Sequence, residues 1–342
     1  MLTTSPAAVR ARSAALDGWQ AELRAAIRDP RRLCEALGLP LELAHAAGTS
    51  AAAAEFPLFV PASFLRRIEP GNPHDPLLRQ VWPGPEEASP SPGFVLDPTA
   101  DARYAVAPGL LKKYAGRALM VLTGACAVHC RYCFRRHFPY DETPATEAAW
   151  NVALQAIEAD ASIREVILSG GDPLTVTDPR LARLAARLAA ISHVERLRVH
   201  TRLPVMIPSR VTAALADWLS GTRLTPVMVI HANHARELDA EVAAALQRLR
   251  TAGVQMLNQA VLLRGVNDTV EAQEQLSLRL VALGVTPYYL HQLDRVRGAA
   301  HFEVPIDQGR TLLAELRRRL PGYAVPQYVQ EQPGALHKVV LS

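Results

Sequence analysis

From about residue 119 to residue 320, apolar runs with high β-propensity alternate with amphipathic stretches of helical periodicity. The short apolar runs predict six strands, at residues 119–122, 165–168, 197–200, 226–230, 255–261 and 285–290. The stretches that follow them repeat apolar residues at helical spacing and predict helices at 146–160, 178–191, 209–219, 236–252, 269–283 and 306–320. Six strand–helix units in succession indicate parallel strands joined by right-handed crossovers.

Polar residues collect just after the ends of these strands, where parallel barrels gather their functional groups. This position favours a curved partial barrel, although an open doubly wound sheet would fit the same alternation. We therefore predict an α/β core over residues 96–320. Neither a glycine-rich dinucleotide motif nor a P-loop occurs in the chain, so the pattern supports neither of those binding modes.

The remaining parts of the chain do not follow this rhythm. Residues 1–95 are expected to form a mostly helical N-terminal extension, and residues 321–342 a C-terminal tail. Helical patterns in the extension lie at residues 13–28, 44–54 and 59–68. Cys34 falls in another helical pattern and is expected to be buried. Residues 70–98 are rich in Pro, Gly, Asp and Glu, which predicts an extended connection over the surface without a catalytic cluster.

Composition and charge narrow the class of protein. The 342 residues are 49% hydrophobic, enough for a large core, and the net charge is only +4. Much of the arginine lies in helical stretches, which indicates solvated helix faces and no nucleic-acid site. The chain has neither an apolar run of about 20 residues nor a secretory signal. Its four cysteines do not resemble a disulfide framework, so we expect a cytoplasmic protein that does not contact membranes.

Three of the four cysteines, Cys126, Cys130 and Cys133, lie within eight residues directly after the first predicted strand. Three thiolates are one fewer than a closed zinc site or a fully ligated cubane cluster needs, which leaves one position open for a substrate. The spacing C-x3-C-x2-C matches radical S-adenosylmethionine enzymes. In those enzymes the open iron of a [4Fe–4S] cluster is chelated by S-adenosylmethionine. The alternative is a structural zinc site completed by His129 or His137.

The second predicted strand ends in Ser169, Gly170, Gly171 and Asp172. The two glycines allow backbone to approach a ligand closely, and the carboxylate of Asp172 offers an acceptor for an ammonium group. Taken alone, such a turn is typical of many loops. After a second strand, in a chain with the cysteine motif, it resembles the radical S-adenosylmethionine motif that holds the methionyl amino group.

The later strands are also followed by polar residues: His200, Arg202, His231, Asn233, His234, Asn258, Gln259, Asn267, His291 and Asp294. Each alone is typical of a helix cap, but their repetition at one end of successive strands indicates a common polar mouth. His231 and His234 have no third metal ligand beside them in the sequence, which disfavours a metal pair. Lys338 follows a Pro-Gly turn in the tail, where a lysine is usually a solvated surface residue.

Together these motifs identify a resemblance to the lysine 2,3-aminomutase family of radical S-adenosylmethionine enzymes. The chain looks closest to the branch that makes (R)-β-lysine for modification of translation elongation factor P. The likeness covers nearly the whole chain and is carried by residues 71–80, 108–114, 126–140, 169–174, 201–204, 258–263 and 288–302. It implies a partial (β/α)6 TIM-like radical SAM barrel with a helical N-terminal extension and a C-terminal cofactor-binding tail.

The resemblance also implies cofactor sites. Cys126, Cys130 and Cys133 would ligate the [4Fe–4S] cluster. The S-adenosyl-L-methionine site would be lined by Ser169, Gly170, Gly171 and Asp172. Lys338 matches the lysine that carries pyridoxal 5'-phosphate as a Schiff base, and Arg117 lies where the family places a contact to the phosphate of that cofactor. Around Lys338 the family usually has Lys-Thr-Pro, whereas this chain has Lys-Val-Val, which bears on the local geometry.

Three residues match the family's substrate contacts. Arg135 matches the arginine that forks onto the substrate carboxylate, a planar partner that suits a guanidinium. Asp294 matches a carboxylate that binds the distal ammonium of lysine. Glu331 lies seven residues before Lys338, where a second carboxylate is expected, and it is Glu where the family has Asp. Two acidic groups near a distal ammonium explain a preference for lysine over glutamate.

The activity implied is that of an isomerase that converts L-α-lysine to (R)-β-lysine by a radical reaction. The implied partners are L-lysine, a reductant protein such as flavodoxin or ferredoxin, and a functional link to elongation factor P and its lysine ligase. A homo-oligomer is left open. Two alternatives within this chemistry are free lysine metabolism and a radical reaction without pyridoxal phosphate. A non-catalytic zinc- or cluster-binding interaction module is the alternative from a different class.

Overall fold

The computed structural model describes residues 18–48, 55–140 and 146–341. Within them, one ten-stranded sheet runs in the order β1 to β10. The six predicted strands are present as β3 (Arg117–Val121), β4 (Glu165–Ser169), β5 (Arg196–Thr201), β6 (Thr225–Ile230), β7 (Gln255–Val261) and β8 (Thr286–His291). Neighbours in this series pair in parallel, which confirms the predicted strand–helix repeat.

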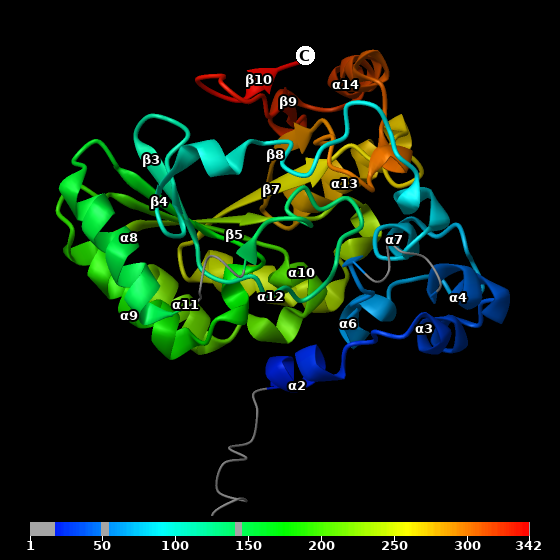
Figure 1. The fold of residues 1–342 in the computed structure, drawn as a ribbon, viewed down its shortest axis with the longest axis horizontal. Helices are drawn as coiled ribbons and strands as arrows, with labels where there is room; N and C mark the ends of the chain where they lie inside the picture. Colours follow the sequence, from blue (N-terminus) through cyan, green and yellow to red (C-terminus); the bar gives the residue numbers. More distant parts are fainter. Residues whose placement is uncertain (1–17, 49–54, 141–145, 342) are drawn as a thin grey trace, which may run out of the picture.

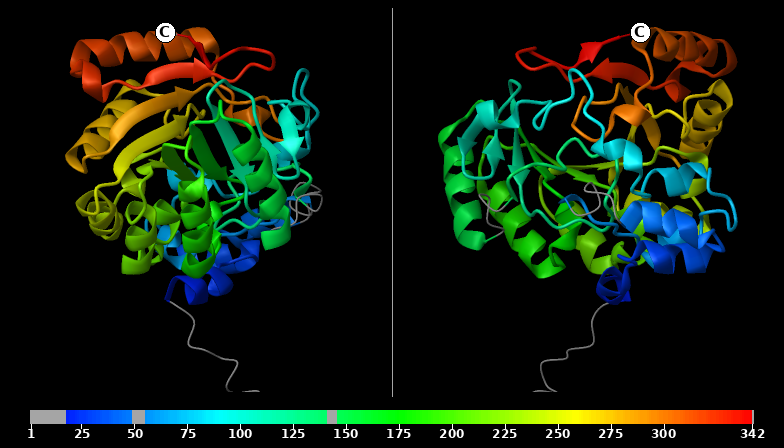
Figure 2. Two further views of the ribbon diagram at one scale, coloured as in Figure 1. Left: turned by 90° about the vertical axis from the view of Figure 1, so that its left-hand side faces the viewer. Right: turned by 45° about the vertical axis from the view of Figure 1, so that its right-hand side comes forward.

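Helices return along the outer face of the curved sheet, as Figures 1 and 2 show. They are α8 (Glu147–Ala159), α9 (Asp178–Ala190), α11 (Ala213–Ser220), α12 (Ala240–Thr251), α13 (Val270–Ala282) and α14 (Ile306–Arg319). Thr146, Thr212 and Thr269 begin three of them, because each hydroxyl accepts a backbone N–H of the first turn. The segment predicted as one helix from residue 209 is divided into η5 (Pro208–Arg210) and α11, and α10 (Leu203–Met206) precedes it.

Side chains alternate along the strands between the helical layer and the barrel interior. In β5, Leu197 and Val199 are fully buried under the helices. Arg198 and His200 alternate with them and are only partly buried. Because successive side chains of a strand point to opposite faces, the charged and imidazole groups line the inside of the barrel. The interior is therefore polar along part of its length and not only at its mouth.

Four short strands outside the predicted series extend the sheet at both edges. β1 (Ala105–Ala107) and β2 (Leu110–Leu111) add antiparallel strands beside β3. β9 (Gln327–Gln330) pairs in parallel with β8, and β10 (Val339–Val340) pairs antiparallel with β9. The strand order leaves β1 and β10 at the two edges, so the barrel is partial. The C-terminal tail is thus part of the sheet, next to β8 and α14 (Figure 1).

The N-terminal extension is helical, as predicted, and gathers on one side of the barrel (Figure 1, blue). Its helices are α2 (Gly18–Ala25), α3 (Pro30–Leu37), α4 (Leu41–Gly48), α6 (Ala62–Leu65) and α7 (Pro76–Arg79). Parts of two predicted helices, residues 13–17 and 49–54, lie outside the described residues. Cys34 is fully buried in α3, which confirms the prediction for that residue.

The segment 70–98 differs from its prediction as a surface connection. It contains α7 and the 3-10 turn η1 (Pro85–Ala88). Leu77 and Val81 are fully buried, because Asp75 caps α7 through the backbone N–H of Leu77 and turns the apolar residues inward. Pro and Gly predicted the turns correctly, but they hid the short apolar run between them. This segment therefore contributes buried groups to the barrel.

One apolar core contains side chains from the extension, the barrel and the tail, including Trp19, Val199 and Tyr328. The three parts therefore share buried surface, and boundaries at residues 95 and 320 stay a prediction. Within the described residues, no helix is both long enough and apolar enough to cross a membrane.

Candidate active site

The loop that carries Cys126, Cys130 and Cys133, called the cysteine loop below, follows β3 at the carboxyl end of the barrel strands. Cys126, Cys130 and Cys133 are all free thiols and partly accessible. Burial raises the pKa of Cys126 well above its usual range, and the neighbouring Cys133 and Cys130 raise it further. Burial and Cys130 likewise raise the pKa of Cys133, to about 11. The three sulfur atoms are therefore close enough to repel one another as thiolates, and a bound cationic centre would relieve this repulsion.

The two imidazoles considered for a zinc site each have one ring nitrogen next to a backbone carbonyl oxygen. His129 Nδ1 lies 2.7 Å from the carbonyl oxygen of Pro57, and its ring stacks on Phe56. His137 Nε2 lies 3.2 Å from the carbonyl oxygen of Arg297. Among residues 18–48, 55–140 and 146–341, no three His, Cys, Asp or Glu side chains are grouped to hold a single metal ion. Each histidine has a second ring nitrogen outside these contacts, so the zinc alternative stays a prediction.

A buried ion pair from the N-terminal extension holds the cysteine loop. Arg131, between the second and third cysteines, donates through Nε and Nη2 to the two carboxylate oxygens of Glu87, at 2.7 and 2.6 Å. Arg136 donates to Glu87 as well, at 2.7 Å. Glu87 and Arg131 have no exposed side-chain surface, and each charge is paired. Glu87 lies in the segment predicted to be a surface connection, so sequence reasoning missed this role.

The glycines after β4 are required by backbone packing. A Cβ atom on Gly170, whose φ is +127°, would lie 2.5 Å from the carbonyl oxygen of Thr123. A Cβ atom on Gly171 would lie 2.5 Å from the carbonyl oxygen of Ala125 and 2.6 Å from that of Gly124. Because they lack Cβ atoms, the two glycines pack directly against the backbone at the start of the cysteine loop. The sequence indicated a close approach correctly, but the approaching group is the backbone at the start of the cysteine loop.

Replacing Gly171 by Ala is expected to destabilise the protein by about 3 kcal/mol, the upper part of the range for inserting a methyl group into a packed interior. The added carbon would meet two carbonyl oxygens of the cysteine loop. Urea unfolding measures the change. Gly322→Ala is the matched control, because Gly322 is exposed and its added Cβ would meet no atom within 4 Å. Equal stabilities for the two variants would show that the cysteine loop moves aside freely.

Asp172, whose contact to S-adenosyl-L-methionine stays a prediction, accepts several hydrogen bonds from the chain itself. Its carboxylate accepts hydrogen bonds from the Thr201 hydroxyl and from the backbone N–H groups of Leu174, Arg202 and Leu203, at 2.8 to 3.0 Å. Burial raises the pKa of Asp172 although these donors lower it. They occupy the lone pairs of both oxygens, so the carboxylate joins the ends of β4 and β5. It positions the loop and offers no free acceptor in this structure.

The tail brings Lys338 and Glu331 together at the barrel mouth. Lys338 Nζ lies 2.5 Å from Glu331 Oε2, and Lys113 Nζ lies 2.6 Å from Glu331 Oε1. The Tyr114 hydroxyl donates to Glu331 Oε1 as well. Burial alone would raise the pKa of Glu331, but the two lysines and the hydroxyl lower it to about 2. Glu331 is therefore a buried, ionised carboxylate that binds cationic groups. Lys113 and Tyr114 are partners that sequence reasoning missed.

Asp294 lies in the same group of charges. Burial raises its pKa to about 7, Lys338 and Lys113 lower it, and Glu331 raises it. The structure therefore brings together Asp294, Glu331 and Lys338, which are separated by up to 44 positions in the sequence. With its pKa near neutrality, Asp294 is poised to lose a proton when a further cation arrives.

Arg135 already holds a carboxylate in the structure. Its Nε and Nη2 atoms both lie 2.9 Å from Asp101 Oδ2, and its Nη1 donates to the Ser169 hydroxyl at 3.1 Å. Arg135 and Asp101 line a cavity of about 500 Å³ together with Phe134 and Phe138. The Arg135 guanidinium, predicted to bind a substrate carboxylate, thus binds the carboxylate of Asp101. Asp101 is a partner that sequence reasoning missed. Asp101 lies in the 3-10 turn η2 (Asp101–Tyr104), which no periodic pattern marks.

Arg117 begins β3, and its guanidinium lies 4.8 Å from the centre of the Tyr114 ring. It makes no ion pair with any residue in the described ranges. A partly buried guanidinium without a carboxylate partner is suited to an anion such as a phosphate. The structure places Arg117 at the amino end of its strand, in contact with the tyrosine that bonds Glu331.

Three imidazoles at or next to the barrel strands have a buried Nε2 atom without a hydrogen-bond partner among the described residues: His200, His231 and His291. Burial lowers the pKa of all three, to about 3 for His231, so their rings are neutral. Lys338 lowers the pKa values of His200 and His291 further, which places both near the tail lysine. Unpartnered polar atoms inside a barrel are what a polar ligand would satisfy. In contrast, His234 Nδ1 caps η6 (Ala235–Glu237), as expected of a strand-end residue without a metal.

The chain is similar to known proteins over most of its length. The model of the Radical SAM superfamily matches residues 120–274. An L-lysine 2,3-aminomutase of Escherichia coli is 45% identical over 325 residues, which is 95% of this chain and 94% of that protein. The L-lysine 2,3-aminomutase of Haemophilus influenzae is 44% identical over 94% of this chain and 95% of its own length. That of Clostridium subterminale is 35% identical, over 86% and 71%.

Proposed function

The chain belongs to the lysine 2,3-aminomutase family of radical SAM enzymes, and on this premise we propose that it converts L-lysine to (R)-β-lysine with pyridoxal phosphate at Lys338. The family consists of isomerases that use a [4Fe–4S] cluster and S-adenosyl-L-methionine. The observation that carries the proposal is the convergence of Lys338, Glu331 and Asp294 at the mouth of the barrel. We further propose that the product supplies the modification of elongation factor P.

The three partly accessible thiols fit an incompletely ligated cluster. Cys126, Cys130 and Cys133 would hold it, and the repulsion between their buried sulfurs would be relieved by its iron. When bound, the cluster and S-adenosyl-L-methionine supply a carbon radical that removes hydrogen from the substrate. The chain's own contribution is to fix the loop through Glu87 and Arg131 and to keep it dry.

The groups around Lys338 fit pyridoxal phosphate. The Lys338 amine would carry it, the unpaired Arg117 would contact its phosphate, and the unpartnered imidazoles would face a polar ligand. When bound, the cofactor supplies a conjugated ring over which an unpaired electron can spread. Lys338 is now paired with Glu331, so release of that contact would leave Glu331 free to accept another cation.

The substrate contacts follow from the charges at the mouth. Glu331 and Asp294 would bind the distal ammonium of lysine, in place of the lysines that now face them. Arg135 would bind the α-carboxylate, in place of the Asp101 carboxylate. In both cases a protein group of the same charge now stands where a charged end of the substrate would bind. A substrate with a distal carboxylate would leave Glu331 and Asp294 unpaired and repelled.

Lysine binding is expected to strengthen as the pH rises through about 7. Because an ammonium group binds the ionised carboxylate, Asp294 with its pKa of about 7 must lose its proton first. The apparent Kd should therefore be about tenfold weaker at pH 6 than at pH 8. Calorimetric titration in buffers of different ionisation enthalpy measures both the affinity and the proton released. Asp294→Asn should weaken binding and remove this pH dependence. Unchanged proton release in that variant would assign the titration to another group.

The test of the activity is an anaerobic assay. The reconstituted protein receives dithionite, S-adenosyl-L-methionine, pyridoxal phosphate and L-lysine, and the products are separated on a chiral column. (R)-β-Lysine is the expected product. Formation of 5'-deoxyadenosine without β-lysine would retain the radical chemistry and reject the substrate. Absence of both in protein with a full cluster would reject the proposed activity.

The role in modification of elongation factor P is tested separately. A strain without the gene should accumulate elongation factor P that lacks the β-lysyl group, and added (R)-β-lysine should restore the modification. Restoration by the free product would mean that the enzyme acts through its product and need not contact elongation factor P. Normal modification in the deletion strain would favour free lysine metabolism.

A further inference from the structure

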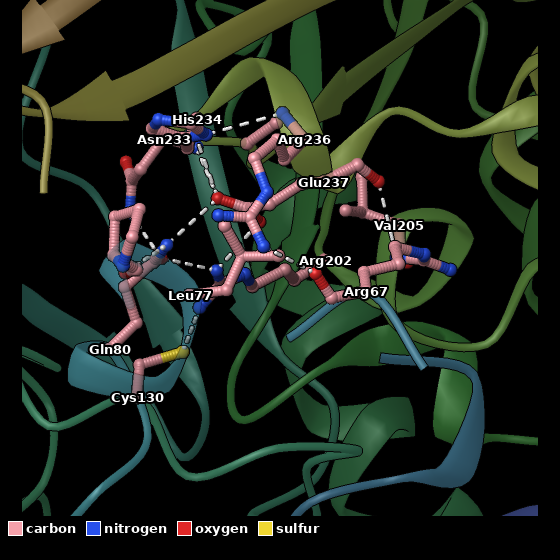
Figure 3. A network of polar contacts seen from close by, with 12 residues as sticks. Arg67, Leu77, Gln80, Cys130, Arg202, Val205, Asn233, His234, Arg236 and Glu237 are labelled. Atoms are coloured by element: carbon pink, nitrogen blue, oxygen red, sulfur yellow. Dashed lines mark hydrogen bonds and ion pairs between the residues drawn. The ribbon is translucent and has the colours of Figure 1, made fainter. Parts of the chain in front are cut away.

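A buried guanidinium contacts one of the three cysteine sulfurs. Arg202 Nη1 lies 2.7 Å from Cys130 Sγ, and the Arg202 residue is 6% exposed. Figure 3 shows this contact at the lower edge of a polar network that joins the cysteine loop to the segments after β5 and β6. Arginine is the strongest side-chain donor available to a sulfur, because its charge is permanent and its N–H groups are fixed in a plane.

The position of Arg202 is set from several directions. Its Nη2 atom donates to Glu237 Oε2 at 2.8 Å and to Gln80 Oε1 at 2.6 Å. Its backbone N–H donates to Asp172 at 2.8 Å. Glu237 is itself fully buried and accepts from Gln80 and from the backbone N–H of Asn233, at 3.0 and 2.9 Å. The side chain is therefore held against Cys130 by Gln80, which follows α7, and by Glu237 of η6, while Asp172 in the turn after β4 fixes its backbone.

The three cysteines are not equivalent in this respect. Among the described residues, Cys130 is the one whose sulfur accepts from a charged side chain. Cys133 accepts from the backbone N–H of Arg135. The Arg202 Nε atom is buried and has no hydrogen-bond partner among the described residues. The network thus directs one cationic donor group to one corner of the cysteine triad.

We propose that Arg202 is a positioning residue that raises the reduction potential of the cluster by donating a charged hydrogen bond to Cys130. Hydrogen bonds and positive charge at a cysteine sulfur stabilise the electron-rich state of an iron–sulfur cluster more than the oxidised state. The step concerned is a one-electron reduction by an external donor such as flavodoxin or dithionite, which is oxidised in turn, and no bond is formed or broken. The inference rests on the proposed ligation by Cys130.

The test is a redox titration of the reconstituted protein, followed by electron paramagnetic resonance, without S-adenosyl-L-methionine or lysine. Arg202→Met removes the donor and its charge. We expect its equilibrium constant for reduction to fall at least tenfold, a shift of about 59 mV to more negative potential for a one-electron couple. Arg202→Lys keeps the charge and should shift less. Glu237→Gln removes the opposing negative charge and should shift the potential in the positive direction.

The matched control is Arg67→Lys. Arg67 is also buried and ion-paired, to Asp239 at 2.8 Å, and it donates to the carbonyl oxygen of Glu237 without contacting a cysteine. The reduction potential of the Arg67→Lys protein should equal that of the parent protein. A merely structural role of Arg202 would lower the iron content without shifts of opposite sign in the Arg202 and Glu237 variants. If Arg202→Met takes up no cluster, Arg202→Lys and Glu237→Gln decide the sign.

Two results would overturn the proposal. A parent-like potential in an Arg202→Met protein with full iron and sulfide would remove the role altogether. A parent-like potential with weaker binding of S-adenosyl-L-methionine would assign the guanidinium to the cosubstrate instead. The potential is measured without lysine, so failure of the aminomutase activity would not affect it. A parent protein that takes up no iron would reject the cluster ligation itself, together with this inference.

Discussion

Replacing Lys338 by Ala is expected to lower β-lysine formation by at least about 100-fold, the cost of misplacing a reacting group. Lys338 Nζ lies 2.5 Å from Glu331, and its charge lowers the pKa values of His200 and His291. Without this amine, pyridoxal phosphate would have no covalent attachment there. The activity is measured by the chiral assay. Attachment is measured independently, by borohydride reduction and mass spectrometry of the peptide that carries the cofactor.

Lys113 provides a matched control, because its amine lies 2.6 Å from the other oxygen of the same carboxylate. The structure thus places two lysines at Glu331, and only one can carry the cofactor as proposed. Lys113→Ala should retain the reduced adduct on Lys338. Its only expected effect on the cofactor site is the loss of the ion pair between Lys113 and Glu331. An adduct that maps to Lys113 in the parent protein would move the attachment site and reject the assignment of Lys338.

The Lys-Val-Val sequence around Lys338 has a structural explanation. Val339 and Val340 form β10 and pair with Gln330 and Val329 of β9. β-Branched residues favour this extended conformation, and the pairing fixes Lys338 next to Glu331 on the neighbouring strand. The departure from Lys-Thr-Pro therefore does not remove the position of the amine. Sequence reasoning could not predict this hairpin, because two-residue strands carry no periodic signal.

The barrel itself was predictable because its signal is long and regular. β5 alternates Leu197 and Val199 with Arg198 and His200, and Thr269 caps the helix predicted to begin at that residue. Such patterns depend only on neighbours in the sequence. The cysteine loop and the glycines after β4 were also readable, since covalent spacing limits what those residues can do.

The partners of the functional residues were not predictable from pattern. Gln80, Glu87 and Asp101 contact Arg202, Arg131 and Arg135 over 34 to 122 positions of sequence. Gln80 and Glu87 lie in the segment 70–98, whose Pro and Gly content predicted a surface connection, and Asp101 follows that segment. Long-range pairs of buried charges leave no trace in local periodicity, because their cost is balanced only when the distant partner arrives. The internal contacts of Asp172 were missed for the same reason, since three of its four donors lie 29 to 31 positions away in the sequence.

Loss of a cluster ligand is expected to have the largest effect on the whole protein. Cys130→Ala should reduce iron affinity by more than about 100-fold, because loss of outer partners of a metal site alone costs 10- to 100-fold. The variant should therefore form neither 5'-deoxyadenosine nor β-lysine. It should also lose the brown colour of anaerobically reconstituted protein. Iron and sulfide analysis measures the cluster directly, and zinc is determined in the same samples.

Cys34→Ala is the matched control for Cys130→Ala. Cys34 is fully buried in α3 and lies outside the cysteine loop, so its loss should cost about 1 kcal/mol of stability and leave the iron content unchanged. If Cys130→Ala retains full iron and parent activity, the cysteine triad does not ligate the cluster. If the parent protein binds zinc in place of iron, a non-catalytic zinc-binding interaction module becomes the better interpretation of the chain. Three thiolates are the expected set because a fourth protein ligand would close the position at which S-adenosyl-L-methionine must bind.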